Sequence, residues 1–193
     1  MKKLIFNITL TLVAMMVFTS CVQNNKKQQQ TQQQTPKKVK LQYEYNMFCP
    51  SEILEFADIE ITYADGDGTL ITDTITAGQQ EEDTESTVDF HTNISINSVP
   101  TRLYLTFRYL PKDGVSAGAD KSVSTEATMY FSTVNSDQIF DYVQPYENPT
   151  KSVKASELKA YFDQFNENPP VFDYTLQEKS VGMMNTLGLV KNN

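Results

Sequence analysis

The feature that most constrains the fold of this chain is a two-residue alternation of apolar and polar side chains, which recurs in several short segments. It is clearest in residues 41–47, where Leu41, Tyr43, Tyr45 and Met47 alternate with polar residues. Successive side chains of a β-strand point to opposite faces of a sheet, so this spacing places the four apolar groups on one face. The segment is therefore predicted to be a strand with one buried face.

Other segments carry the same pattern or are rich in β-branched residues. Residues 59–63 alternate, and the sequence DGDG at residues 65–68 then favours a tight turn before the Thr- and Ile-rich residues 69–76, which predicts a β-hairpin. Further strands are predicted in residues 88–96, 103–109, 123–134 and 171–176. Six or seven short strands of this kind indicate an all-β fold, an antiparallel sandwich or barrel.

Three further segments, two of them helical, complete the predicted elements. Residues 50–56 predict a single helical turn between the first two strands. Residues 156–165 predict the one real helix near the C-terminus, because apolar residues recur every three or four positions and two prolines follow at 169–170. Its apolar face is expected to pack against a sheet edge. The C-terminal residues 181–190 are a candidate apolar patch or edge strand, with docking onto the protein's own core as an equal alternative.

The N-terminus has the layout of a secretory signal. Lys2 and Lys3 precede the mostly apolar residues 4–18, and small residues then lead to Cys21. This apolar stretch is shorter than the roughly 20 residues that cross a bilayer, so residues 1–20 are predicted to be a cleaved signal peptide. An ordinary signal peptide with an incidental cysteine is the alternative.

The sequence Phe18-Thr19-Ser20-Cys21 resembles the lipobox of bacterial lipoproteins, although many lipoboxes carry Leu at the position of Phe18. The resemblance implies that Cys21 is acylated on its sulfur, becomes the N-terminus after cleavage and is then acylated on its amine. Two or three chains would anchor the protein, because each buried methylene contributes about 0.8 kcal/mol. Surface-displayed lipoproteins of Gram-negative bacteria often carry acidic residues after the cysteine, which residues 22–25 lack. The resemblance thus implies the outer membrane and favours its periplasmic side.

Residues 21–38 are predicted to be a flexible tether that begins with the lipidated cysteine. After Cys21 the segment is rich in Gln and Lys and has Val22 as its one aliphatic residue. Such a composition buries too little apolar surface to offset its ordering entropy, and a linker of this length reaches roughly 20–25 Å. Residues 39–193 are long enough to bury one core and are expected to form a single domain.

The charge of the chain argues against one class of partner. The formal net charge is -8, whereas nucleic-acid binding draws on clustered Lys and Arg, so no nucleic-acid partner is expected. Residues 39–193 hold ten basic and 24 acidic side chains, a net charge of -14. That charge suits a cationic partner, and it suits simple solubility equally well.

Asp65 and Asp67 are the weak candidates for metal binding. A calcium loop of the EF-hand type that began at Asp65 would need Glu at its twelfth position, which is Thr76. A hairpin turn is therefore predicted, with an adventitious calcium site as the alternative. The acidic residues 81–85 are expected to form a solvated loop.

The chain offers little for catalysis. His91 is the sole histidine, lies in a predicted strand and is accompanied by no nucleophile motif, so neither a zinc site nor a catalytic triad is expected. Lipid on Cys21 would leave Cys49 without an intramolecular disulfide partner, and its apolar neighbours predict a buried, inert thiol, with a reactive or intermolecular thiol as the alternative. We expect no enzymatic activity and no cofactor.

Tyrosines are the candidates for ligand stacking. The chain has ten Tyr and no Trp. Tyr104 lies on the polar face of its predicted strand, and Tyr142 and Tyr146 lie near prolines. These three are candidate glycan-stacking residues, with core packing as the alternative role.

The order of these features resembles a group of small lipoproteins of unknown function from Gram-negative bacteria. The features are a Tyr-rich first strand, the Ser-Glu-Ile-Leu turn, the strand that ends in Asp-Gly-Asp-Gly, and a Tyr-Leu-Pro-Lys exit, within residues 40–135. The resemblance implies an immunoglobulin-like β-sandwich and no active site. We therefore expect a membrane-anchored, non-catalytic binding or structural module that contacts an envelope protein or assembly. A glycan-binding lipoprotein is the first alternative, and a hydrolase is the second.

Overall fold

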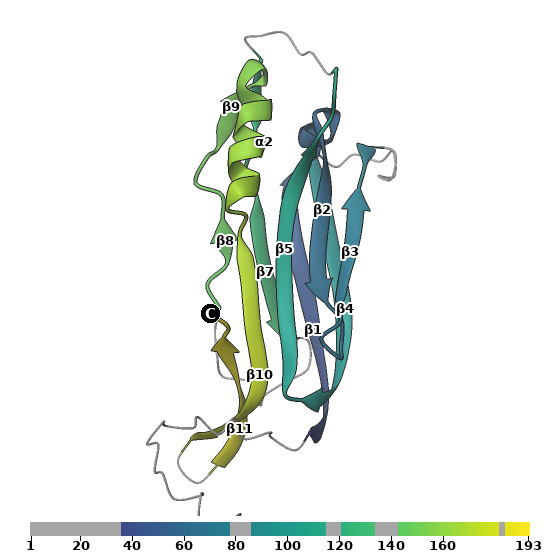
Figure 1. Ribbon diagram of the computed structural model, residues 1–193, viewed down its shortest axis with the longest axis vertical. Coiled ribbons are helices and arrows are strands. Elements are labelled where there is room, and N and C mark those ends of the chain that lie inside the picture. The colour runs from purple at the N-terminus through teal and green to yellow at the C-terminus, as the bar shows by residue number, and fades with distance from the viewer. Residues whose placement is uncertain (1–35, 78–85, 115–120, 134–142, 182–183) are drawn as a thin grey trace, which may run out of the picture. The chain divides into compact units, whose positions relative to one another are not determined.

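The fold is known from a computed structural model, shown in Figure 1. It describes residues 36–77, 86–114, 121–133, 143–181 and 184–193. The strands are β1 (Lys37–Pro50), β2 (Ala57–Ala64), β3 (Leu70–Ile75), β4 (Thr87–Val99), β5 (Thr101–Pro111), β6 (Ser122–Ser124), β7 (Thr128–Thr133), β8 (Tyr146–Glu147), β9 (Ser152–Lys154), β10 (Val171–Val181) and β11 (Met184–Lys191). The helical segments are the 3₁₀ turns η1 (Ser51–Glu55) and η3 (Ala155–Glu157) and the α-helix α2 (Leu158–Glu167).

The described strands form two larger sheets and one small pair, all antiparallel. One sheet has the order β4-β1-β7-β8, the other has the order β11-β10-β5-β2-β3, and β6 pairs with β9. The predicted all-β antiparallel class with one short helix is therefore confirmed. Among the described residues, no helix is long and apolar enough to span a membrane.

The core lies between the two larger sheets. The four apolar side chains of residues 41–47 are buried, as their alternation predicts, and so are the inward residues of β2 and β5. Rings from the two sheets meet: Tyr45 of β1 lies 5.9 Å from Tyr63 of β2, and Phe131 of β7 lies 5.6 Å from Phe172 of β10. These contacts give the fold its sandwich-like layering.

The predicted β2–β3 hairpin is confirmed, and its turn packs on the other sheet. β2 and β3 pair from Ile59 with Ile75 to Ala64 with Leu70. Gly68 adopts a φ of 89°, in the left-handed region that favours glycine. At Gly66 a Cβ would overlap the carbonyl oxygen of Ser95 in β4, so the turn lies directly against the backbone of the neighbouring sheet.

The helix prediction is confirmed in kind and shifted in its bounds. A 3₁₀ turn precedes α2, and the helix ends at Glu167, just before the two prolines. The helix is not terminal, because β10 and β11 follow it, as Figure 1 shows. Its Phe162 is buried and lies 4.6 Å from the ring of Tyr109 in β5.

Several predicted strand bounds differ from the structure. The predicted strand 123–134 holds two strands in its described residues 123–133, because the buried Thr125 bonds across to the carbonyl groups of residues 150 and 151 and takes β6 out of the line of β7. β1 begins at Lys37, which lies inside the predicted tether, and the ammonium group of Lys37 forms a salt bridge with the carboxylate of Glu178. β10 continues to Val181 because β11 pairs with it, which confirms the predicted C-terminal edge strand.

Candidate binding groove on the five-stranded sheet

An open groove of about 300 Å³ lies on the outer face of the five-stranded sheet. Strands β2 and β5 supply most of its lining, and the residues that lead into β10 close one side. The lining residues are Glu60, Thr62, Tyr104, Thr106, Phe107, Arg108, Pro169 and Val171. Ligand pockets in proteins occupy roughly 300–1,000 Å³, so this groove suits a small ligand or one residue of a larger one.

Strand register brings these residues together. Glu60 pairs with Arg108 across β2 and β5, Thr62 pairs with Thr106, and Thr106 pairs on its other side with Val171 of β10. Alternation then points these side chains outward, whereas their chain neighbours, such as Ile61 and Leu105, are buried. The groove is thus the solvent-facing counterpart of the core face of the same strands.

Hydrogen-bond donors and acceptors both line the groove. Arg108 donates from Nε to Oε1 of Glu60 at 2.6 Å. Thr106 donates its hydroxyl to the carbonyl oxygen of Pro170 at 2.7 Å, and the hydroxyl of Thr62 lies 3.0 Å from that of Thr72. The groove therefore offers acceptors and donors whose positions are held by neighbours on the same sheet.

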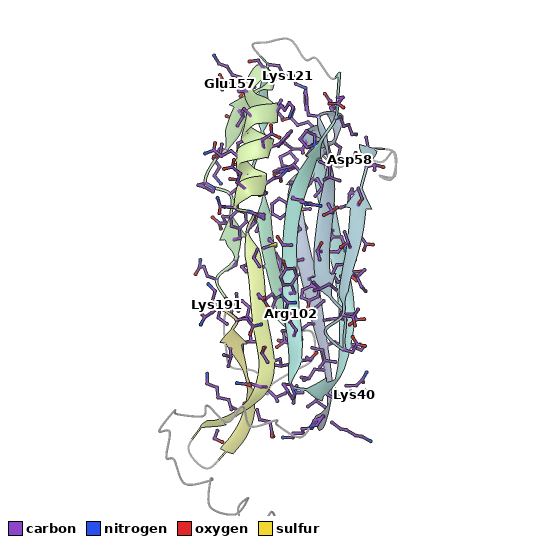
Figure 2. The ribbon with its side chains drawn as sticks, in the orientation of Figure 1. Lys40, Asp58, Arg102, Lys121, Glu157 and Lys191 are labelled. Carbon is purple, nitrogen blue, oxygen red and sulfur yellow. The ribbon has the colours of Figure 1, made fainter. Side chains whose placement is uncertain are left out.

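Tyr104 forms the aromatic part of the groove, and its ring is held from one side. The guanidinium of Arg102 lies over this ring, 4.6 Å from its centroid. Arg102 precedes Tyr104 on the same face of β5, while Thr106 and Arg108, which line the groove, follow it. Arg102 is not among the lining residues, so its contact with the ring lies outside the lining of the groove. Figure 2 shows Arg102 among the side chains of this region.

Arg102 is itself fixed by β10 and the C-terminal residues. Its Nε and Nη2 donate to the two carboxylate oxygens of Asp173, and Asn192 donates to the same carboxylate at 2.6 Å. Hydrogen bonding to Arg102 is the main cause that lowers the pKa of Asp173, and it raises the pKa of Arg102 in return. Both groups stay ionised at neutral pH, so the support behind Tyr104 is permanent there.

The three predicted stacking tyrosines do not form one platform in the described residues. Tyr146, on β8, packs against Phe107, whose side chain points from β5 into the core. Burial raises the pKa of Tyr146 to about 12. Tyr104 lies on the opposite face of β5, so Tyr104 and Tyr146 are separated by the sheet. Tyr142 lies outside the described residues.

Asp65 and Asp67 use their carboxylates to hold the hairpin turn. Oδ1 of Asp65 accepts from the backbone N–H groups of Asp67 and Thr69, and Oδ1 of Asp67 accepts from the backbone and hydroxyl of Thr69. The bond from the Thr69 side chain is the main cause that lowers the pKa of Asp67. Across the described ranges, no three His, Cys, Asp or Glu side chains gather as a metal site. The acidic residues 81–85 lie outside those ranges.

His91 and Cys49 occupy unrelated positions away from the groove. His91 is exposed on β4, with Nδ1 3.7 Å from Oδ1 of Asp89, and it does not line the groove. The predicted burial of Cys49 is confirmed, since the residue is 3% exposed. Desolvation raises the pKa of its thiol to about 12, so it is protonated in the folded protein.

Sequence reasoning identified Tyr104 but missed the other groove residues. Except for Pro169 and the inward-pointing Phe107, each of them occupies an outward position of a predicted strand, and that alternation was the available signal. The alternation does not indicate which strands lie side by side in a sheet. Cys21 and the tether up to residue 35 lie outside the described residues.

Comparison of the chain with protein-family models, with curated proteins and with solved structures finds no match in any of the three.

Proposed function

We propose that this protein is a lipid-anchored module of the cell envelope that works by binding and not by catalysis. The anchor would be Cys21, on the periplasmic side of the outer membrane, and the tether would hold the domain close to that surface. The support for the anchor is the charged, apolar and small-residue order of residues 1–21. The support for binding is the groove on the outer face of the five-stranded sheet, which is the observation that carries the proposal.

The first candidate partner is an envelope protein or assembly that contacts this outer face. The exposed side chain of Val171 supports such a contact, because it adds apolar surface beside the charged Glu60–Arg108 pair. Glycan binding is the alternative, and the placement of Tyr104 in the groove favours it. A hydrolase has less support, because His91 lies outside the groove.

The finer fold assignment, an immunoglobulin-like sandwich, also belongs to this proposal. In immunoglobulin domains the strands named B and E lie in one sheet and C, F and G in the other. The corresponding neighbours here are β1 and β4 in one sheet and β2, β5 and β10 in the other. β7 lies beside β1, where strand A would lie, although it comes later in the chain. This order supports an immunoglobulin-like arrangement with a rearranged edge.

The anchor is tested by growing a Gram-negative expression host with labelled palmitate. We expect label in the wild-type chain and in Cys49→Ser, which removes the other cysteine, and none in Cys21→Ser. The Cys21→Ser protein should also leave the membrane fraction. Label that persists in Cys21→Ser, or an unlabelled wild-type chain, would contradict the anchor.

The binding face is tested with a photoreactive amino acid in the native envelope. At Val171, which lines the groove, it should give one discrete cross-linked product. At Asn97, an exposed residue of β4 in the other sheet, it should give none. Equal products from both positions would show that the outer face of the five-stranded sheet is not the contact surface.

A further inference from the structure

We propose that the groove binds a neutral sugar ring, which stacks on the free face of Tyr104 and hydrogen-bonds to Glu60 and Arg108. This inference rests on the proposed binding function and develops its glycan alternative by naming the ligand class of the same site. It rests on three observations: the fixed ring of Tyr104, the paired donor and acceptor beside it, and the position of the groove over interior strands.

The first observation is that Tyr104 is a pre-organised platform. Asn192 and Arg102 both bind the carboxylate of Asp173, and the Arg102 guanidinium covers one face of the Tyr104 ring at 4.6 Å. A ring that is already fixed loses little side-chain entropy when a ligand stacks on it. The C–H face of a sugar ring presents the flat, weakly apolar surface that stacks on an aromatic face.

The second observation is the chemistry beside the ring. Glu60 supplies carboxylate acceptors, and the Arg108 side chain donates to Glu60 from Nε, which is its one side-chain hydrogen bond to the described residues. The remaining guanidinium donors of Arg108 are half-exposed at the groove. A sugar hydroxyl both donates and accepts, so a pair of adjacent hydroxyls matches this acceptor and donor together.

Charge favours a neutral ligand over an ionic one. The Glu60–Arg108 ion pair compensates its own charges at the groove. An anionic ligand would approach a domain whose residues 39–193 carry a net charge of -14. A cationic ligand would have to compete with Arg108 for Glu60 at 2.6 Å. A neutral polyhydroxyl ring is not repelled by the net charge and does not have to displace Arg108 from Glu60.

The third observation separates a sugar from an extended peptide. Peptides that bind to sheets usually pair with the free backbone of an edge strand. The groove instead lies over β2 and β5, which pair with each other beneath it from Thr62–Thr106 to Glu60–Arg108, and beside the start of β10. Because the backbones of β2 and β5 are paired with each other there, a ligand over these two strands is recognised by side chains.

The experiment uses the full chain, extracted from membranes in detergent, and a panel of neutral trisaccharides built from glucose, mannose, galactose or N-acetylglucosamine. Saturation-transfer NMR with irradiation of aromatic protons should transfer signal to ring C–H protons of at least one sugar. Titration of that sugar gives the dissociation constant. Arrays of neutral peptides in the same detergent test the competing ligand class.

The variants separate stacking from hydrogen bonding. Tyr104→Ala should weaken binding roughly three- to tenfold and abolish the saturation transfer, whereas Tyr104→Phe should keep both within twofold. Glu60→Gln should weaken binding and leave the transfer detectable. Tyr130→Ala is the matched control, because Tyr130 stacks on Phe48 at 6.0 Å in the other sheet and should not affect binding.

Three results would overturn the inference: no sugar of the panel binds, Tyr104→Ala binds as well as the wild type, or peptides bind and sugars do not. The last result would leave the groove as a protein-binding surface. Palmitate labelling at Cys21 is independent of all three. A labelled chain without sugar binding therefore retains the proposed anchor and loses only the ligand assignment.

Discussion

The guanidinium of Arg102 binds both carboxylate oxygens of Asp173, with Nε 2.9 Å from Oδ1 and Nη2 2.6 Å from Oδ2. The pair joins β5 to β10, where Asp173 lies opposite Tyr104 in the register. Asn192, just after β11, donates to Asp173 and also bonds to its backbone. One carboxylate thus connects two strands, the C-terminal residues and the side chain that backs Tyr104.

This connection predicts a measurable loss of stability in Asp173→Asn. Two-point Arg–carboxylate pairs are the stronger exposed ion pairs, and Asp173 is only about a quarter exposed, so we expect a loss of about 1 kcal/mol in the free energy of unfolding. Urea denaturation measures it. The matched control is Asp163→Asn, which breaks the exposed pair with Lys159 one helical turn away and should cost less than about 0.5 kcal/mol. Equal losses would mean that the two-point geometry adds nothing.

The same pair predicts a pH dependence with a definite sign. The pKa of Asp173 is lowered in the folded protein, mainly by hydrogen bonding to Arg102. Its contribution to stability is therefore fully present above the unfolded pKa of about 3.9 and is lost as the pH falls through the lower folded value. Urea denaturation at pH 7, 5 and 3 should show a wild-type advantage over Asp173→Asn that is constant from pH 7 to 5 and smaller at pH 3. An advantage that grows on acidification would contradict the assignment.

Most strands were predictable because their signal is local. The alternation in residues 41–47 and 59–63 states which face is buried without reference to any other part of the chain. The groove was not predictable because it depends on partners distant in sequence: Arg108 meets Glu60 across 48 residues. Tyr104 was identifiable from its outward position, but its support by Asp173 depends on a register that single-strand patterns do not contain.

The same limit explains the split of residues 123–134 into β6 and β7. Val, Thr, Tyr and Phe recur through this segment with no Gly or Pro to mark a break, so it predicts one strand. What divides it is Thr125, whose hydroxyl and N–H bond to the carbonyl oxygens of Thr150 and Lys151. Those acceptors lie on a segment whose position no local pattern indicates.

The number of reactive thiols tests two things together, the burial of Cys49 and the lipidation of Cys21. Cys49 is buried and its pKa is raised to about 12, so it should not react with a thiol reagent in the folded protein at pH 8. If Cys21 carries lipid, the chain extracted from membranes should show no reactive thiol when folded and one in urea. A chromogenic disulfide reagent measures both values.

The cysteine variants make this count unambiguous. Cys49→Ala should show no reactive thiol in either state when Cys21 is acylated. A bare Cys21 would instead give one thiol in the folded wild type and two in urea. Rapid reaction of Cys49 in the folded Cys21→Ser protein would contradict its burial.

Substitution of Asn166, a residue of α2, should destabilise the fold strongly. The pairing of β5 with β10 ends at Thr106 and Val171, and farther along β5 the side chain of Asn166 bonds to the backbone of Tyr109 instead. Its Oδ1 accepts from the N–H of Tyr109 at 3.0 Å, and its Nδ2 donates to the carbonyl oxygen of Tyr109 at 2.6 Å. Asn166→Ala leaves both backbone groups without these bonds, and we expect a loss of about 2 kcal/mol in urea denaturation.

Two further substitutions check this account. Asn168→Ala changes an exposed asparagine at the end of the same helix and should alter the unfolding free energy by less than about 0.5 kcal/mol. Asn166→Asp keeps an acceptor for the N–H but directs a charged oxygen at the Tyr109 carbonyl, so it should also destabilise. A stable Asn166→Asp at neutral pH would show that the donor to the carbonyl is dispensable.

The contact between Gly66 and Ser95 predicts that the β2–β3 turn tolerates no side chain at its second position. A Cβ at Gly66 would overlap the carbonyl oxygen of Ser95, which belongs to the backbone of β4 and cannot rotate away. Gly66→Ala should therefore separate the turn from β4, at a cost of about 2–3 kcal/mol. The amide shifts of Ser95 and Ile96 in ¹H–¹⁵N spectra should change along with the urea midpoint.

Gly114→Ala distinguishes this steric cause from a conformational one. Gly114 has a φ of 75° and open space where a Cβ would lie, so alanine there costs only the left-handed conformation, about 1 kcal/mol. It should leave the Ser95 and Ile96 amide shifts unchanged, since no contact with β4 is involved. The pair of variants thus isolates the contact itself: if Gly66→Ala matches Gly114→Ala in stability and leaves the Ser95 amide unmoved, the turn does not lie against β4.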